Sequence, residues 1–497
     1  MLFNSVDFLI FFPIVTLIYF LIPHKIRYLW LLLCSYYFYM CWNAQYALLL
    51  FASTFITWLS GLAIDAAAKK EADDPTRLKS RGIVAISLIL NLSLLFFFKY
   101  ANFALENVNS LLARFGVAFR APKLDLLLPV GISFYIFQAL SYTIDVYRGE
   151  IKVERNLLRY MVFVSFFPQL VAGPIERSSR LLGQFYEKHS FSYDRAVRGL
   201  MMMLWGYFQK MVVADRLSVL VDQVFNYSSY YAGFEILVGA VFFAFQIYCD
   251  FAGYSTIAIG AAQILGFELM ENFRQPYLAV SVADFWRRWH ISLTSWFRDY
   301  LYIPLGGNRR GKWMKYRNIM IVFLSSGLWH GANWTYVIWG GLNGLFQIIG
   351  AQTKKLRCAV KTRLGIRENS GSGRLLSVIT TFLLVDLTWI FFRAATLTDA
   401  VTVFRQLFST FNPWVLFDGT LYTLGLSTID FWIGVLAIAA IGVVDLLHER
   451  NIRIREWILQ QNLLFRWVVY FIAIFTILIF GFYGPNYDAA QFIYFQF

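Results

Sequence analysis

Long apolar stretches separated by short polar segments dominate this chain. Runs such as 82–98 ("GIVAISLILNLSLLFFF") and 467–482 ("WVVYFIAIFTILIFGF") approach the roughly 20 residues that an α-helix needs to cross a bilayer. The pattern predicts an all-α polytopic membrane protein with about 10–12 transmembrane helices, some re-entrant segments and interfacial amphipathic helices. Single crossings are expected near residues 6–22, 29–42, 46–65, 82–99, 127–146, 198–214, 235–265, 375–394, 430–447 and 466–484.

Two further apolar runs, 157–175 and 319–352, are each flanked by basic loops, so each is expected to enter and leave the membrane on the same side. Pro168, Gly173 and Pro174 interrupt the first run, and the residues "HGAN" (330–333) interrupt the second. Broken backbone at membrane depth is tolerated only when it is packed inside protein. Eleven apolar residues precede the second break, or ~16 Å of helix, which predicts that His330 lies near the middle of the membrane.

Residues 281–303 ("SVADFWRRWHISLTSWFRDYLYI") have the pattern of one amphipathic helix. Ser281 and Asp284 form a capping signature at its start, and Pro304 ends it. At about 100° per residue, an apolar stripe that contains His290 faces away from a polar stripe. We expect a helix at the cytoplasmic interface with its aromatic rings turned inward. The apolar stripe holds Trp286, His290, Leu293 and Phe297, and the polar stripe holds Asp284, Arg288, Ser292, Ser295 and Asp299.

The composition supports a membrane class, since 59% of residues are hydrophobic and only 15% are charged, against roughly 25% charged in soluble proteins. The net charge of +14 does not indicate nucleic-acid binding, because the basic residues are confined to certain loops, as the positive-inside rule requires. One loop fits poorly: 100–127 falls outside by crossing count yet carries Arg114, Arg120 and Lys123. Loops 24–27, 69–81, 148–155, 309–317, 354–374 and 450–455 are expected in the cytoplasm, and 226–233, 412–430 and 484–497 outside.

The chain reads as one membrane-embedded domain over 1–497, with a core at about 80–355 and C-terminal helices at 375–497. The first apolar segment lacks the flanks of a cleaved signal peptide, so we expect it to remain as a helix. No Walker-type loop supports ATP-driven transport. The four cysteines have neither metal nor redox spacing.

Two of the five histidines, His290 and His330, lie on apolar faces, whereas the others lie in or beside basic loops. An intramembrane histidine is a candidate functional residue, although a core histidine bonded to a carbonyl is the plainer alternative. A catalytic zinc is not expected, because no third histidine or cysteine ligand is nearby. Asp386 and Arg393, seven residues apart, are placed to pair, while Asp250 suits a polar lining.

Several long motifs resemble the membrane-bound O-acyltransferase family. The segments "DFWRRWHISLTSWFRDYLYIPLGGNRRG" (284–311) and "SSGLWHGANWTYVIWGGLNGL" (325–345) are similar to its two-histidine signature. Further similarity lies in 169–182, in 248–267 and in the C-terminal "FIYFQF". The continuation "YIPLGGNR" resembles the alginate O-acetyltransferase branch; the branch that transfers D-alanine to teichoic acid is similar but typically shorter.

The resemblance implies that His330 is catalytic and that His290 occupies the second signature position. It also implies acetyl-CoA as donor, no tightly bound cofactor, and a bacterial plasma membrane location. The expected partners are an acyl-CoA or acyl-carrier donor in the cytoplasm and, outside, a polysaccharide or a protein that relays the acetyl group. We expect a second set of residues to bind substrate or line its channel: Asp250, Trp286, Arg288, Trp329 and Asn333.

The chemistry of acyl transfer supports a role for histidine independently of the family resemblance. Moving an acyl group from a thioester to an alcohol needs a base on the hydroxyl, and histidine accepts a proton near neutral pH. His330 is the expected base, and His290 is expected to orient the donor. Two alternatives stay open: D-alanyl transfer from a carrier protein to teichoic acid, and a proton-coupled transporter with His330 as a proton relay, which the broken apolar segments also suit.

Overall fold

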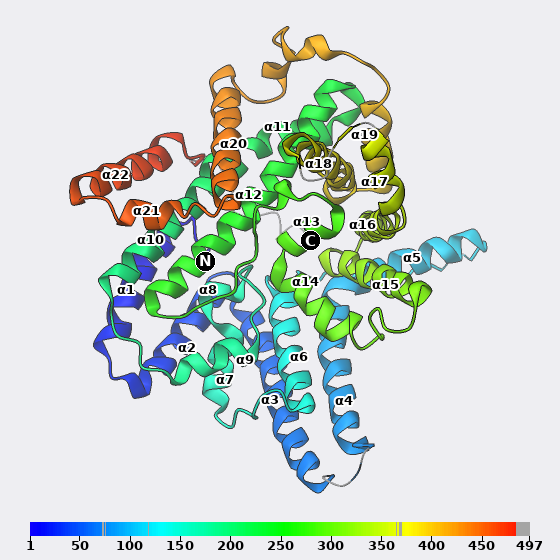
Figure 1. Ribbon diagram of the computed structural model, residues 1–497. Helices are drawn as coiled ribbons and strands as arrows, with labels where there is room; N and C mark the ends of the chain where they lie inside the picture. Colours follow the sequence, from blue (N-terminus) through cyan, green and yellow to red (C-terminus); the bar gives the residue numbers. More distant parts are fainter. Residues whose placement is uncertain (72–73, 75, 118, 364, 367–369, 484–497) are drawn as a thin grey trace. The chain divides into compact units, whose positions relative to one another are not determined.

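The computed structural model describes residues 1–71, 74, 76–117, 119–363, 365–366 and 370–483. Within these ranges all regular structure is helical, which confirms the all-α class (Figure 1). The chain divides into two compact units: unit 1 holds 1–203 and 257–270, and unit 2 holds 204–256 and 271–497. The expected external segment 484–497, with its "FIYFQF" motif, lies outside the described residues.

Most of the first half of the chain belongs to unit 1. Its α-helices are α1 (Val6–Leu21), α2 (His24–Met40), α3 (Ala47–Lys70), α4 (Leu78–Leu95), α5 (Ala101–Arg114), α6 (Ile132–Arg148), α7 (Leu157–Ser165), α8 (Phe167–Leu170), α9 (Ser178–Leu181) and most of α10 (Tyr193–Tyr207). Helices α3, α4, α6 and α7 pack on one another, and α6 is buried over nearly its whole length.

Unit 2 holds the rest. A π-helical segment (Phe208–Ala214) follows α10. The α-helices are α11 (Asp215–Asn226), α12 (Phe234–Leu265, its last turns in unit 1), α13 (Val282–Arg288), α14 (Ile291–Phe297), α15 (Lys312–His330), α16 (Trp334–Gln352), α17 (Lys354–Arg363), α18 (Gly371–Arg393), α19 (Leu397–Leu407), α20 (Thr428–Glu449), α21 (Ile454–Leu459) and α22 (Leu463–Phe480).

Helices of membrane-spanning length lie in both halves of the chain, as the apolar pattern predicts. Among the described residues, six helical stretches are long and apolar enough to cross: 44–70, 78–114, 234–265, 371–393, 428–449 and 463–480. This is fewer than the 10–12 expected, because several predicted crossings form shorter helices: α1 and α2 have 16 and 17 residues. The stretch 78–114 includes α5, so much of the expected 100–127 loop is helix.

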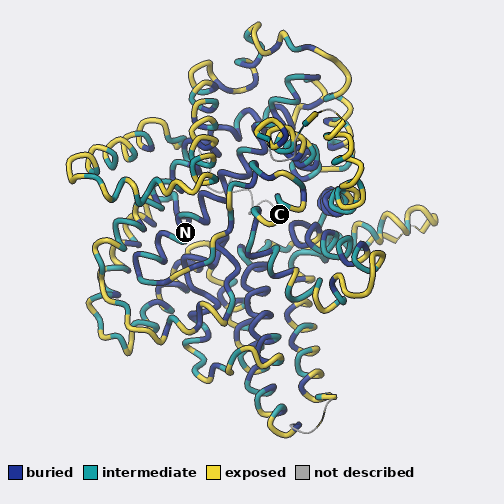
Figure 2. Tube along the Cα trace, in the orientation of Figure 1, coloured by how far each residue is buried: buried dark blue, intermediate teal, exposed yellow. Residues whose placement is uncertain are grey.

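The spanning helices differ in what surrounds them. In α12, 78% of the most apolar window is buried inside the protein, against 6% in α22 (Figure 2). An apolar helix that the protein leaves uncovered is suited to contact with lipid, whereas a helix buried all round belongs to the interior. Helix α12 therefore forms the interior of the fold, and α22 presents its apolar surface outward.

The first predicted interruption, in 157–175, is real and is packed inside unit 1. Helix α7 ends at Ser165, Phe166 adopts a non-helical conformation, and α8 starts at Phe167 with Pro168 in its first turn. Every residue from 162 to 176 is buried. The buried side chain of Gln138 donates to the Phe163 carbonyl at 2.8 Å. A break in a helix frees backbone carbonyl groups. The break is tolerated in an apolar setting because donors on neighbouring helices form hydrogen bonds with such groups.

The second predicted interruption separates α15 from α16. Helix α15 ends at His330, Gly331 is extended, and Asn333 caps α16 by accepting from the Thr335 N–H. The two helices pack closely because a Cβ at Gly327 or Gly340 would overlap backbone atoms of the facing helix.

Helix α15 begins at Lys312, seven residues before the apolar run, so His330 lies ~27 Å along its axis. It also lies beside Phe392, in the last turn of α18. Relative to these two helices, His330 is thus at an end rather than halfway. The polar first turns of α15 belong to the same helix as the apolar run, and the membrane depth of His330 stays a prediction.

The single helix expected over 281–303 is wrong in one respect. Ser281 caps α13 by accepting from the Asp284 N–H at 3.1 Å, as predicted. The helix then breaks at His290, whose φ and ψ of 45° and 53° are left-handed, and α14 begins at the next residue. Ser292, expected on the polar face, is fully buried. A periodicity argument assumes unbroken helical geometry, so a single left-handed residue changes every face after it.

Unit 1 also buries an acid within the motif 169–182. Glu176 is fully buried; one carboxylate oxygen accepts from the Met270 N–H, and the other has no hydrogen-bond partner among the described residues. Burial raises its pKa from the ordinary 4.5 to about 7, more than the nearby Arg180 and Arg177 lower it. The folded state therefore holds this proton at pH values where an unfolded chain has lost it.

This raised pKa predicts a pH-dependent stability. The contribution of the protonated Glu176 side chain to the free energy of unfolding is complete below pH 4.5 and is lost as the pH rises to about 7. The loss is on the order of 3 kcal/mol, since one pKa unit is about 1.4 kcal/mol. The glutamine of Glu176→Gln cannot ionise. The melting temperature of this variant in detergent, relative to that of the wild type, should therefore increase between pH 5 and 8. A constant difference across that range would contradict the assignment.

Candidate active site

His330, the last residue of α15, is enclosed by aromatic rings. The side chain is buried, and its imidazole meets Trp329, Trp339 and Phe392 edge-on, at ring-centroid distances of 5.0, 5.0 and 5.3 Å. These rings come from α15, α16 and α18, and Trp339 and Phe392 belong to a buried hydrophobic cluster of unit 2. The site is therefore assembled from three helices, and water has little access to the imidazole.

His290 lies at the junction of α13 and α14 and is fully buried. Burial lowers its pKa from 6.5 to about 3, so the ring is neutral at physiological pH. Phe251 of α12 packs edge-on against it, with ring centroids 4.7 Å apart. Its left-handed backbone is uncommon for a residue with a side chain, and such strain tends to persist where the surrounding structure holds it for a function.

The structure brings the two signature histidines together. Their ring centroids are 6.3 Å apart, with an angle of 62° between the ring planes. The imidazole nitrogens lie on the ring edges, so a hydroxyl or carbonyl group that reached both rings could contact both histidines. An imidazole can accept a proton from one group and return it to another.

Asn272, in the loop after α12, holds His290, and the sequence analysis missed it. Its side-chain oxygen lies 3.1 Å from His290 Nδ1 and accepts from the Ser292 N–H and hydroxyl at 3.2 and 2.9 Å. Its backbone carbonyl accepts from the Ile291 N–H at 3.0 Å. The residue is 18 positions from His290, and an isolated asparagine in a loop gives no periodic signal.

Trp286, Trp329 and Asn333, expected as substrate-binding or channel-lining residues, all lie near the histidines. The Trp286 indole donates to the Asn343 side chain at 3.1 Å and packs edge-on against Trp339. The Trp329 ring lies edge-on to both histidines, with ring centroids 5.9 Å from His290 and 5.0 Å from His330. Asn333 caps α16 and donates to the Ala395 carbonyl at 2.8 Å, so its amide ties α16 to the segment after α18.

Asp250, also expected to line a channel, belongs to a buried ionic cluster, and its role toward substrate stays a prediction. Lys210, in the π-helical segment, forms ion pairs of 2.7 Å with both Asp250 of α12 and Asp215 of α11. None of the three side chains is more than 5% exposed. Phe251, the next residue in α12, touches His290. The cluster thus fixes the helix that forms one wall of the site.

The expected pair of Asp386 and Arg393 is not formed. Arg393 pairs with Asp222 of α11, and one Asp386 carboxylate oxygen has no hydrogen-bond partner among the described residues. Seven residues place two side chains on one helix face but ~10 Å apart along the axis. A neighbouring helix offers a closer partner than the same helix does.

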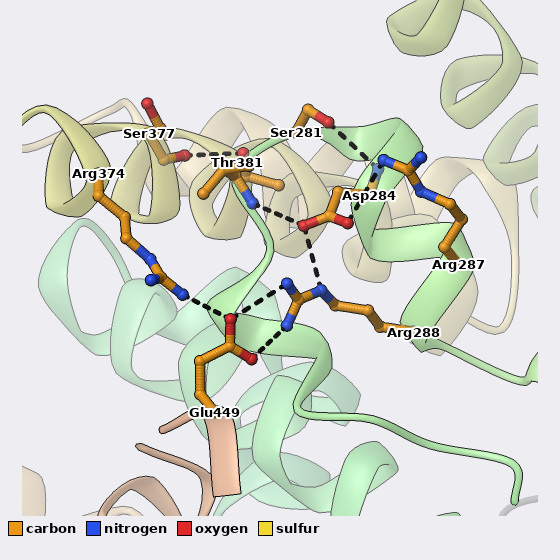
Figure 3. Close-up of polar contacts among 9 residues, drawn as sticks. Ser281, Asp284, Arg287, Arg288, Arg374, Ser377, Thr381 and Glu449 are labelled. Atoms are coloured by element: carbon orange, nitrogen blue, oxygen red, sulfur yellow. Dashed lines mark hydrogen bonds and ion pairs between the residues drawn. The ribbon is translucent and has the colours of Figure 1, made fainter. Parts of the chain in front are cut away.

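Arg288 lies in a network of ion pairs that joins three helices (Figure 3). Its guanidinium contacts Asp284 at 3.1 Å and both carboxylate oxygens of Glu449, at 2.7 and 3.3 Å. Arg374 also contacts Glu449. The network ties the end of α13 to the start of α18 and the end of α20.

Comparisons with known proteins identify a family and relatives over most of the chain. Residues 149–382, which include both histidines, match the model of the membrane-bound O-acyltransferase family. The chain is 38% identical over 457 residues to a probable alginate O-acetylase of Pseudomonas putida, covering 91% of this chain and 89% of the relative.

Two other relatives have different substrates in their names. A peptidoglycan O-acetyltransferase of Helicobacter pylori is 35% identical, over 76% of this chain and 73% of its own. A teichoic acid D-alanyltransferase of Bacillus subtilis is 28% identical, over 44% and 58%. The similarity to the probable alginate O-acetylase extends beyond the two-histidine motifs to nine-tenths of this chain. The chain therefore belongs to the membrane-bound O-acyltransferase family and is an O-acyltransferase.

Proposed function

We propose that this protein O-acetylates an extracytoplasmic polysaccharide, directly or through a partner protein, with a cytoplasmic thioester as donor. The buried pair of His290 and His330 carries the proposal, because it supplies proton-transfer groups in an enclosure shielded from water. The names of the two relatives with the larger coverage support acetyl transfer to an envelope polysaccharide. Membership of an acyltransferase family favours this over the transporter alternative.

In the proposed step, His330 accepts the proton of the acceptor hydroxyl while the hydroxyl oxygen attacks the thioester carbonyl carbon. The carbon–sulfur bond then breaks, and the thiolate leaves with the proton that the imidazolium returns. His290, whose ring centroid lies 6.3 Å from that of His330, orients the donor. Positioned proton transfer of this kind typically contributes ~10²–10⁴-fold to the rate.

Acetyl-CoA is the proposed donor, since its polar nucleotide keeps it on the cytoplasmic side. The basic loops 354–374 and 450–455 mark that side, and the Arg288 network lies beside them at the start of α18 and the end of α20. Arg288 already has carboxylate partners, which favours a role in positioning α13 over direct contact with the donor. The proposed location is a bacterial plasma membrane.

Transfer of D-alanine from a carrier protein is the second candidate, and the teichoic acid D-alanyltransferase relative supports it. The same two histidines would serve both reactions, because each moves an acyl group from a thioester to a hydroxyl. The two reactions differ in the ester that they leave on the envelope.

Mass spectrometry of surface glycans from cells with and without this protein distinguishes the candidates. Ester-linked acetate should disappear without the protein, return with the wild type, and fail to return with His330→Gln. Loss of ester-linked D-alanine would establish the second candidate instead. If neither ester depends on the protein, the proposed function is wrong. Purified protein incubated with labelled acetyl-CoA then tests the donor.

The proposed topology predicts which loops are accessible from each side. Single cysteines at Lys354 and Arg450 should react with an impermeant thiol reagent only from the cytoplasm, and one at Asp418 only from outside, since α18 and α20 each cross once. All three positions are exposed. Exposed Cys41 and half-buried Cys358 must first be replaced. Labelling of positions 354 and 418 from the same side would contradict the topology.

A further inference from the structure

Asn272 makes an unusually complete set of contacts around one histidine. Its side-chain oxygen meets three groups, His290 Nδ1 and the backbone and hydroxyl donors of Ser292, while its amide nitrogen donates to the Ser255 hydroxyl of α12 at 3.4 Å. Asn272, His290, Ser292 and Ser255 are each at most 2% exposed. All four lie in unit 2.

These contacts determine which end of the amide faces His290. A backbone N–H can only donate, so the atom that meets the Ser292 N–H must be the amide oxygen. An amide oxygen has no hydrogen to give, so His290 Nδ1 must carry one in order to bond to it. In a neutral imidazole the other nitrogen, Nε2, then has the lone pair.

The same loop also holds the backbone of the junction. The Asn272 carbonyl accepts from the Ile291 N–H at 3.0 Å, and the Arg274 N–H donates to the Arg288 carbonyl at 2.9 Å. These bonds lie on either side of His290, whose left-handed conformation costs energy for a residue with a Cβ. Phe273 packs edge-on against Trp289 and Phe251, at 5.0 and 5.1 Å, which fixes the loop in place.

We propose that Asn272 is a positioning residue for acyl transfer: it fixes the tautomer of His290 so that Nε2 serves as a hydrogen-bond acceptor, and it holds the bend that aims the ring. The effect on transfer rests on the proposed function; the tautomer does not. A histidine in this state can receive a hydrogen bond from the acceptor hydroxyl or from His330, but it cannot donate one to the carbonyl oxygen from Nε2 without first gaining a proton.

The tautomer can be observed without any activity assay. The chain has five histidines, so the protein in detergent, labelled with ¹⁵N-histidine, gives few ring signals, and the spectrum of His290→Gln identifies those of His290. The expected result is a protonated Nδ1 and an unprotonated Nε2. The opposite tautomer in the wild type would overturn the proposal, whatever the enzyme acylates.

Substitutions at Asn272 then test the link to transfer. Asn272→Leu removes the acceptor oxygen and should lower kcat/KM for the donor about as much as His290→Gln does, with loss of the Nδ1–H signature. The double variant should be no worse than His290→Gln alone, since Asn272 acts through that ring. Independent, multiplying losses would overturn the positioning role, as would an unchanged tautomer in Asn272→Leu.

Two further variants separate positioning from folding. Asn272→Asp keeps an acceptor oxygen, so at alkaline pH, where the imidazole stays neutral, it should retain the Nδ1–H signature and more activity than Asn272→Leu. Asn318→Leu is the matched control, because Asn318 is equally buried but bonds to the Leu305 and Gly307 carbonyls. It should lower the melting temperature without changing the His290 signals. Equal loss of activity in the Asp and Leu variants would overturn the proposal.

Discussion

Replacing His330 with glutamine is expected to lower turnover ~10²-fold or more while the fold and donor binding survive. Glutamine fills a similar volume between Trp329, Trp339 and Phe392 and can form hydrogen bonds, but it cannot accept a proton near neutral pH. Single-turnover transfer from labelled acetyl-CoA in detergent measures the chemical step separately from product release. Circular dichroism and donor binding check that the variant is folded.

His290→Gln is the matched comparison, because it makes the same chemical change 6.3 Å away. We expect it to keep a measurable fraction of turnover and chiefly to weaken use of the donor, since we assign this ring to positioning. If His330→Gln retains near-full single-turnover transfer while His290→Gln abolishes it with donor binding intact, the base is assigned to the wrong histidine.

The second large effect is expected at Lys210. Lys210→Met removes the ammonium group that pairs with both Asp215 and Asp250, and it leaves two buried carboxylates without that partner. Breaking a buried ion pair from one side typically costs about 3–5 kcal/mol. The melting temperature and the denaturation midpoint in detergent should therefore fall sharply. Activity should fall with them, because Asp250 precedes Phe251, which packs against His290.

The control for this prediction removes the charge without leaving carboxylates behind. The triple variant Lys210→Met with Asp215→Asn and Asp250→Asn should recover much of the lost stability, since uncharged replacements of a buried ionic cluster are often tolerated. Lys123→Met, which breaks an exposed pair with Glu106, should change stability far less. A small effect of Lys210→Met, equal to that of Lys123→Met, would show that the buried cluster does not stabilise the fold.

The apolar pattern determined the class of the fold because burial in lipid demands long runs of apolar residues and leaves little freedom in how they fold. Each predicted single crossing contains a helix, and both predicted interruptions, near Pro168 and at 330–333, interrupt helices in the structure. The number of spans was less certain. Length and composition identify a span only when one helix carries the whole run, and α1 and α2 are too short for that criterion.

The sequence alone also singled out His290 and His330, since a histidine on an apolar face is costly and needs a reason. The tertiary structure decided that the two rings meet, that His290 interrupts its helix in a left-handed conformation, and that Asn272 holds it. It also decided that Arg393 forms an ion pair with Asp222 and that Asp250 forms one with Lys210. Periodicity reports which face a residue takes along one element, whereas a partner on another element depends on packing that no local pattern encodes.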